Sequence, residues 1–169
     1  MDNLEKTLFE QLIRFSQRTV WFVALAVALP STLPAQTATE YEAKAALLFN
    51  FIKFVRWPES AEANRRDFVI AAPTASAFGS SLKSLDGKRV QGRTVRLVHY
   101  DGDRLPEVCD VIIVGLPTWD RLSDATRAKL TDRNVLTVSE AAEFTRHHGV
   151  LSLFLDNEHL AFDINVVAA

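Results

Sequence analysis

The densest apolar pattern in the chain runs from Tyr41 to Pro58. Its apolar residues fall on two neighbouring stripes at helical spacing. They are Tyr41, Ala45, Leu48, Ile52 and Val55 on the first stripe, and Leu47, Phe51 and Phe54 on the second. This arc is wider than that of an ordinary surface helix. The segment 39–42 has the form of a capping box, so we expect the helix to begin there. We expect it to end near Arg56, because the residue before a proline avoids helical geometry.

Short apolar runs alternate with turn-rich or helical segments through the rest of the chain. Strands are expected at 68–72, 94–100, 111–114 and 135–138, helices at 76–85, at 118–130 and after residue 139, and a hairpin at 149–155 and 160–166. Thr118 and Ser139 are the expected N-caps of the last two helices. This order predicts an α/β fold: a mostly parallel sheet of five or six strands, helices on both faces and a C-terminal antiparallel hairpin.

Length and charge narrow the class of protein. With 169 residues and a net charge of -2, one globular domain is expected. The chain has no basic run with interleaved aromatic residues, so nucleic acid is not an expected partner. The one cysteine, Cys109, cannot form a disulfide within the chain.

The N-terminal segment has the order of a secretory signal. Arg14 and Arg18 precede an unbroken apolar core, residues 20–29, and small residues follow at Ala35 and Ala38. The apolar core is about half of the ~20 residues that a membrane-spanning helix needs. We therefore expect export to the periplasm, with the signal cleaved near Ala35 or Ala38.

Cleavage divides the chain into a signal peptide, residues 1–38, and a single domain, residues 39–169, that no longer inserts into a membrane. The first ten residues fit a signal less well, because Asp2, Glu5 and Glu10 are acidic. A start codon assigned too early would explain this acidic lead.

Side chains with catalytic potential are few. Cys109 would need a base and a lowered pKa to act as a nucleophile, and His99 is the candidate base if the two strands are neighbours. Adjacent Asp110 disfavours the thiolate, so packing is the preferred role for Cys109. A thiol-dependent enzyme is kept as the least favoured alternative.

Metal and cofactor sites are not expected. His147 and His148 are adjacent and point apart, so they chelate poorly together, and pairing either with His159 lacks a supporting carboxylate or cysteine cluster. Their simpler role is at the end of a helix, where cationic imidazole meets the helix dipole. No phosphate loop, dinucleotide fingerprint or paired-carboxylate motif is present. These patterns favour a binding protein over an enzyme.

The helix at 41–58 is the leading candidate for a contact surface. Lys44, Asn50 and Lys53 interrupt its apolar arc, and Asn50 and Lys53 are helical neighbours. Aromatic side chains beside a cation are typical of protein interfaces. The candidate partner-binding residues are Tyr41, Lys44, Asn50, Lys53 and Trp57.

Several motifs in sequence order resemble the YfiR family of periplasmic proteins. The first and most specific is YEAKAALLFNFIKFVRWP at 41–58; the others are AFG at 77–79, VQGRTV at 90–95, CDVIIV at 109–114, VLTVS at 135–139, GVL at 149–151 and FDIN at 162–165. The resemblance covers essentially the whole domain. It implies a repressor that binds the periplasmic domain of a membrane-bound diguanylate cyclase, lowering cyclic-di-GMP signalling and affecting biofilm formation. No catalysis is implied.

The chain departs from the family pattern in two places. Relatives carry additional cysteines that pair, and the run 68–72 has none here, which argues against disulfide-based sensing. Relatives also continue past the FDIN strand into a final helix, whereas this sequence stops at Ala169. Exposure of the sheet face which that helix would cover favours association, so a homodimer is a further expected option.

A small-molecule receptor of the periplasm is the main alternative function. Ligands of parallel α/β sheets bind at the carboxyl ends of the strands. In this sequence that rim is expected to include Pro73, Tyr100, Gly115 and Ser139.

Overall fold

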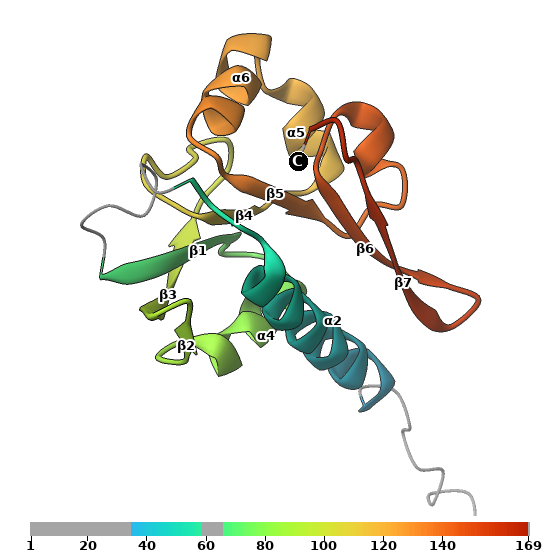
Figure 1. Cartoon of the computed structure of the whole chain (residues 1–169). Coiled ribbons are helices and arrows are strands. Elements are labelled where there is room, and N and C mark those ends of the chain that lie inside the picture. The colour runs from blue at the N-terminus through green and yellow to red at the C-terminus, as the bar shows by residue number, and fades with distance from the viewer. Residues whose placement is uncertain (1–34, 59–65, 169) are drawn as a thin grey trace, which may run out of the picture. The chain divides into compact units, whose positions relative to one another are not determined.

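The computed structural model describes residues 35–58 and 66–168 (Figure 1). The chain divides at residue 35 into two units, and apart from Ala35 the described residues all belong to the second, Gln36–Ala169. The predicted signal core and its basic flank lie outside the described residues, so export and cleavage stay predictions. No helix in the described ranges is long and apolar enough to cross a membrane.

A seven-stranded sheet forms the centre of the second unit (Figure 1). Its strands are β1 (Asp67–Pro73), β2 (Arg89–Val90), β3 (Arg93–Tyr100), β4 (Val111–Ile113), β5 (Leu136–Ser139), β6 (Leu151–Asp156) and β7 (His159–Ile164). The order is β2-β3-β1-β4-β5-β6-β7. The five inner strands are parallel, while β2 and β7 pair antiparallel at the two edges. The predicted α/β class and closing hairpin are confirmed. The additional strand is β2, whose two residues are too short to leave an apolar pattern.

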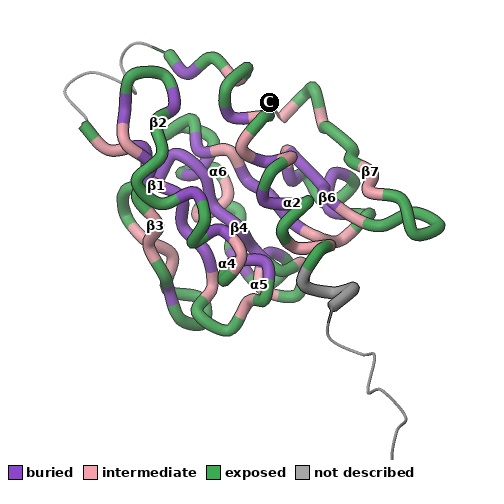
Figure 2. Tube along the Cα trace, turned by 90° about the horizontal axis from the view of Figure 1, so that it is seen from below, coloured by how far each residue is buried: buried purple, intermediate pink, exposed green. Residues whose placement is uncertain are grey.

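Helices cover both faces of the sheet. They are α2 (Ala35–Phe54), α4 (Ala77–Ser81), η1 (Leu82–Leu85), α5 (Leu116–Arg121), α6 (Asp124–Asp132) and η2 (Phe144–His147). Alternate residues of β1 enter different cores: Ile70 packs in the core that contains residues of α2, α4 and η1, and Ala71 in the core of α5, α6 and η2. The inner strands consequently form the buried centre seen in Figure 2.

The helix predicted at 41–58 begins earlier than the capping-box pattern predicts. α2 already includes Ala35, so Thr39 lies inside it and is not its N-cap. The intervening residues, AQTA at 35–38, contain no proline or glycine, so nothing in them breaks the helical backbone. At its other end α2 stops at Phe54, two residues before the predicted end at Arg56.

The helix predicted at 118–130 is two helices. Leu122 has extended backbone with ψ 138°, and Ser123 starts α6 by accepting a hydrogen bond from the Thr126 amide at 3.2 Å. Thr118 therefore lies inside α5, whose N-cap is Gly115. The prediction was wrong because a second capping serine interrupts the apolar pattern.

Ser139 also has a different place from the one predicted. It is the last residue of β5, and the next helical turn, η2, begins only at Phe144, after its N-cap Glu143. The Ser139 hydroxyl accepts from the Ala141 amide at 3.4 Å, so it supports the turn that leaves the strand.

The closing hairpin turns tightly. Asp156 and His159 are the last paired residues, so the loop is only Asn157 and Glu158. Both have positive φ, 46° and 65°, as a type I′ turn requires. The right-handed twist of such a turn matches that of its strands, so β6 and β7 stay in continuous register.

Candidate functional site

α2 buries its first apolar stripe against the sheet. Ala45, Leu48 and Ile52 are at most 1% exposed, as the helical spacing predicts. The second stripe lies at the margin of the sheet. Phe51 on this stripe is half-buried, whereas Phe54 at the end of α2 is 83% exposed. Phe54 faces away from the sheet, because a helix turns by about 100° per residue, which places Phe54 about 160° around α2 from fully buried Ile52.

Lys44 is buried in an ion cluster. Its Nζ lies 2.6 Å from Glu40 Oε1 and 2.8 Å from Glu140 Oε1, and the residue is only 4% exposed. Burial alone lowers the pKa of Lys44, but the hydrogen bonds and charges of Glu140 and Glu40 outweigh it, so the pKa is raised. Lys44 therefore ties α2 to the end of β5 and leaves little surface for a partner.

Trp57 is also buried, just beyond the end of α2. Its Nε1 donates to the Asn134 carbonyl at 2.9 Å, and its ring meets that of Phe68 edge to face with centroids 5.1 Å apart. Gln91 secures the same end by donating to the Ile52 and Val55 carbonyls at 2.9 and 2.6 Å. These bonds satisfy carbonyls that a helix end leaves open.

The exposed polar residues of α2 lie together as their spacing predicts. Lys53 Nζ donates to Asn50 Oδ1 at 3.2 Å and lies 4.4 Å from the centroid of the Phe49 ring. Lys88 Nζ also approaches this ring, at 5.2 Å from its centroid. Tyr41 is half-buried at the opposite end of the described helix, where its carbonyl accepts from Ser81 Oγ. Of the five candidate contact residues, Asn50 and Lys53 have the most surface to offer.

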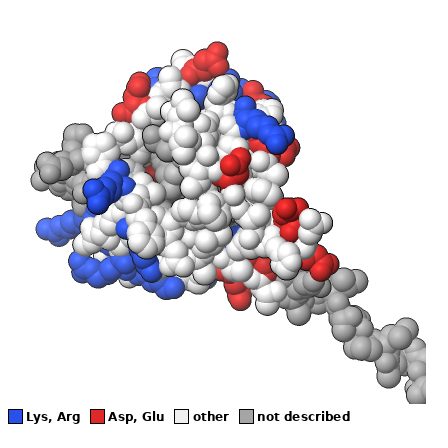
Figure 3. Space-filling view, turned by 45° about the vertical axis from the view of Figure 1, so that its right-hand side comes forward, with Lys and Arg blue, Asp and Glu red and all other residues white. Residues whose placement is uncertain are grey.

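The hairpin meets α2 through two aromatic rings. Phe162 in β7 and Phe51 form an edge-to-face pair with centroids 4.9 Å apart. Phe162 remains 52% exposed and Ile164 38% exposed. We call Asn50, Lys53, Phe54, Phe162 and Ile164 the α2–hairpin surface. In Figure 3, which brings the β7 side of Figure 1 forward, the middle of the visible face is largely free of charged side chains.

A cavity of about 230 Å³ adjoins this surface. Phe51, Trp57, Leu136 and Ile164 contribute apolar walls, and Arg56 is the charged residue among the described residues that line it. It lies where β5 and β6 begin, at the amino ends of these strands. The ligand rim predicted at the carboxyl ends of the strands is therefore not where this cavity lies.

Comparison with protein-family models decides the family. The YfiR/HmsC-like family model matches residues 41–169. The chain belongs to the YfiR/HmsC-like family. No curated protein matches the chain. Family membership supports a general role in periplasmic regulation of diguanylate cyclase signalling.

The strand order separates the residues that a thiol enzyme would need in this family member. Cys109 is buried just before β4, whereas His99 is exposed on β3, and β1 lies between those strands. His99 could act as the base for Cys109 only if β3 and β4 were neighbours, and they are not.

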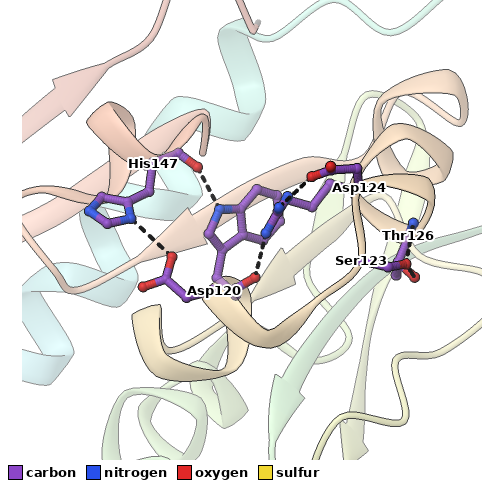
Figure 4. A network of polar contacts seen from close by, with 7 residues as sticks. Asp120, Ser123, Asp124, Thr126 and His147 are labelled. Atoms are coloured by element: carbon purple, nitrogen blue, oxygen red, sulfur yellow. Dashed lines mark hydrogen bonds and ion pairs between the residues drawn. The ribbon is translucent and has the colours of Figure 1, made fainter.

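His147 belongs to a polar network around α5 (Figure 4). Its Nδ1 lies 2.9 Å from Asp120 Oδ1, and its carbonyl accepts from Trp119 Nε1 at 2.7 Å. Arg127 adds a hydrogen bond to the Trp119 carbonyl and an ion pair with Asp124. Within the described ranges, no three His, Cys, Asp or Glu side chains are grouped to hold a metal ion. The network fits the structural role expected of a histidine at a helix end.

Sequence reasoning missed three residues that shape the surface. Glu140 holds Lys44 from a distant part of the chain, and Gln91 secures the end of α2 from a turn with positive φ at residue 91. The third is Phe54, which is exposed because it lies about 160° around α2 from fully buried Ile52. Only the glycine after Gln91 signals the turn in the sequence.

Proposed function

We propose that this protein is an exported inhibitory module that binds the periplasmic domain of a membrane-bound diguanylate cyclase and holds the enzyme inactive. Family membership supports the signalling context. The observation that carries the proposal is the α2–hairpin surface, where Phe54 is 83% exposed beside Lys53. The role is one of binding, since the YfiR-like family consists of regulators rather than enzymes.

The composition of the surface fits a protein partner. Phe54 and Phe162 offer large apolar area, and such rings dominate binding energy when a partner covers them. Lys53 sits one residue away and already lies over the Phe49 ring, so its ammonium is positioned to meet a carboxylate. Loss of an aromatic anchor at the centre of an interface typically costs 2 kcal/mol or more of binding free energy, roughly a thirtyfold loss of affinity.

Capture from membranes tests the contact. The tagged protein with Phe54→Ser should recover much less cyclase from a membrane extract than the parent protein. Lys53→Glu should do the same by placing a negative charge at the surface. Lys129→Glu is the matched control, because Lys129 is exposed on α6 and is not part of the α2–hairpin surface. Equal recovery by all four proteins would contradict the assigned surface, and failure of the parent to recover any cyclase would contradict the function.

A small-molecule receptor is the second candidate, favoured by the cavity beside Trp57. A cavity of about 230 Å³ with apolar walls and one guanidinium suits a small apolar or aromatic acid. Melting the protein with a panel of such acids tests this. A raised melting temperature that is lost in Arg56→Gln is expected; no shift with any of them would exclude the receptor function for this class.

A further inference from the structure

The two edges of the sheet are built differently. At one edge, β2 has only two residues and is accompanied by exposed Lys88 and Arg89. Short strands and long cations are features by which natural sheets prevent further pairing. At the other edge, β7 has six residues, contains no Lys, Arg or Pro, and pairs with β6 without a bulge. β7 therefore lacks the features that protect β2.

Alternate residues of β7 direct their peptide groups away from β6. The Asn165 amide donates to the Val150 carbonyl at 2.9 Å, which assigns the odd-numbered positions of this strand to bonding with β6. The N–H and C=O groups of Leu160, Phe162 and Ile164 consequently point outward from the sheet. The edge thus presents a regular row of donors and acceptors.

We propose that β7 pairs antiparallel with β7 of a second copy of this chain, about a two-fold axis at Phe162. In this register Phe162 opposes itself, and Leu160 opposes Ile164 of the second copy. The outward groups of all three residues are then bonded. Asp163 opposes Ala161, so no like charges face each other directly. Moving the axis to Asp163 would set two carboxylates opposite one another, which disfavours that register.

The side chains on this edge favour a second copy as the occupant. Leu160, Phe162 and Ile164 lie on the α2 side of the strand, since Phe162 meets Phe51. On this side of the strand, pairing with a second β7 places apolar residues opposite apolar residues at all three positions. It also enlarges the apolar surface to which Phe162, 52% exposed, and Ile164, 38% exposed, belong. The contact is self-complementary, so it closes at a dimer and does not propagate.

A cysteine cross-link reads out the register. In Phe162→Cys, the two Cα atoms across a hydrogen-bonded pair would lie about 5.5 Å apart, within reach of a disulfide. Mild oxidation of the full chain should then give a covalent dimer. Leu160→Cys is the matched control, because its two copies would be roughly 13 Å apart along the strands and should stay unlinked. Adding Ile164→Cys to Leu160→Cys should restore the link, and the parent chain with only Cys109 should show none.

Sedimentation of the unlinked protein tests association itself. The parent should change from monomer to dimer as its concentration rises. Leu160→Pro removes an outward N–H while leaving the bonds to β6, and Phe162→Lys opposes two ammonium groups, so both should remain monomeric. Their circular dichroism checks that they are folded. A parent that stays monomeric, or Leu160→Cys linking as readily as Phe162→Cys, would overturn the proposal.

Discussion

The ring of Phe162 meets that of Phe51 edge to face, with centroids 4.9 Å apart and planes at 76°. One ring belongs to the last strand of the sheet and the other to the helix that precedes the sheet in sequence. Their contact makes the exposed residues of α2 and the outer strand of the hairpin one continuous surface. Two segments that separately suggest partner contact are thus one candidate site.

Coupling between these rings is measurable by a double-mutant cycle. We expect Phe51→Ala and Phe162→Ala to be non-additive by about 0.5–1.5 kcal/mol in the free energy of urea unfolding, the range for edge-to-face pairs. Phe54→Ala with Phe162→Ala is the control cycle, because Phe54 is mostly exposed. Additivity of the first pair within ~0.3 kcal/mol would show that the rings do not support each other.

Replacing Lys44 with methionine should destabilise the fold. The change keeps the buried stem but leaves the carboxylates of Glu40 and Glu140 without their shared cation. Both carboxylates are partly exposed, so the expected loss in the free energy of unfolding is about 1–3 kcal/mol, less than for a fully buried pair. Lys53→Met, at an exposed position on the same helix, should change it by less than ~0.5 kcal/mol. Equal effects of the two substitutions would contradict the structural role of Lys44.

The raised pKa of Lys44 predicts a loss of stability at high pH. A group whose pKa is raised by folding stabilises the native state below its ordinary value, here 10.5, and loses that contribution as pH rises through the native value. Burial, and then the charges of Cys109 and Asp103, raise the pKa of Tyr100, and this works in the same direction. The free energy of unfolding should therefore fall above about pH 10. Lys44→Met and Tyr100→Phe should each reduce that slope; unchanged slopes in both would contradict this origin.

Gly149 allows the chain to pass close to Phe144. A Cβ at residue 149 would overlap the Phe144 ring, which is fully buried. We expect Gly149→Ala to cost about 1–3 kcal/mol, as overpacking does. At Gly115 a Cβ would have only an ordinary contact, 3.9 Å from Pro117 Cδ, so Gly115→Ala should cost less than ~1 kcal/mol. Thermal melts of the two variants measure this difference. A smaller loss of melting temperature in Gly149→Ala than in Gly115→Ala would contradict the close contact with Phe144.

Periodicity predicted the parts of the fold that depend on local pattern. Apolar spacing predicted the buried stripe of α2, the inner strands and the hairpin. Leu48 in α2, Val111 in β4 and Leu153 in β6 are examples of positions that the spacing places in the core. Helix ends were predicted less well. Ser123 interrupts an apolar pattern that otherwise continues, and Thr39 resembles a cap in a segment that is simply helical.

The candidate site was only partly predictable because burial depends on contacts between distant segments. Lys44 and Lys53 look alike as cations on one helix, and only the position of Glu140 makes the first a buried anchor. The sequence suggests that Trp57 is exposed. In the structure its indole N–H donates a hydrogen bond to the carbonyl of Asn134, a contact between distant parts of the chain. Phe162, by contrast, joins the surface because the hairpin folds back beside α2, which no local pattern encodes.

The level of cyclic-di-GMP in cells tests the central claim most directly. Deleting the gene should raise it, and expressing the parent protein or Lys129→Glu in the deletion strain should return it to the original level. Phe54→Ser should accumulate to the same amount and fail to lower it. Unchanged cyclic-di-GMP on deletion, or full restoration by Phe54→Ser, would contradict repression through the α2–hairpin surface.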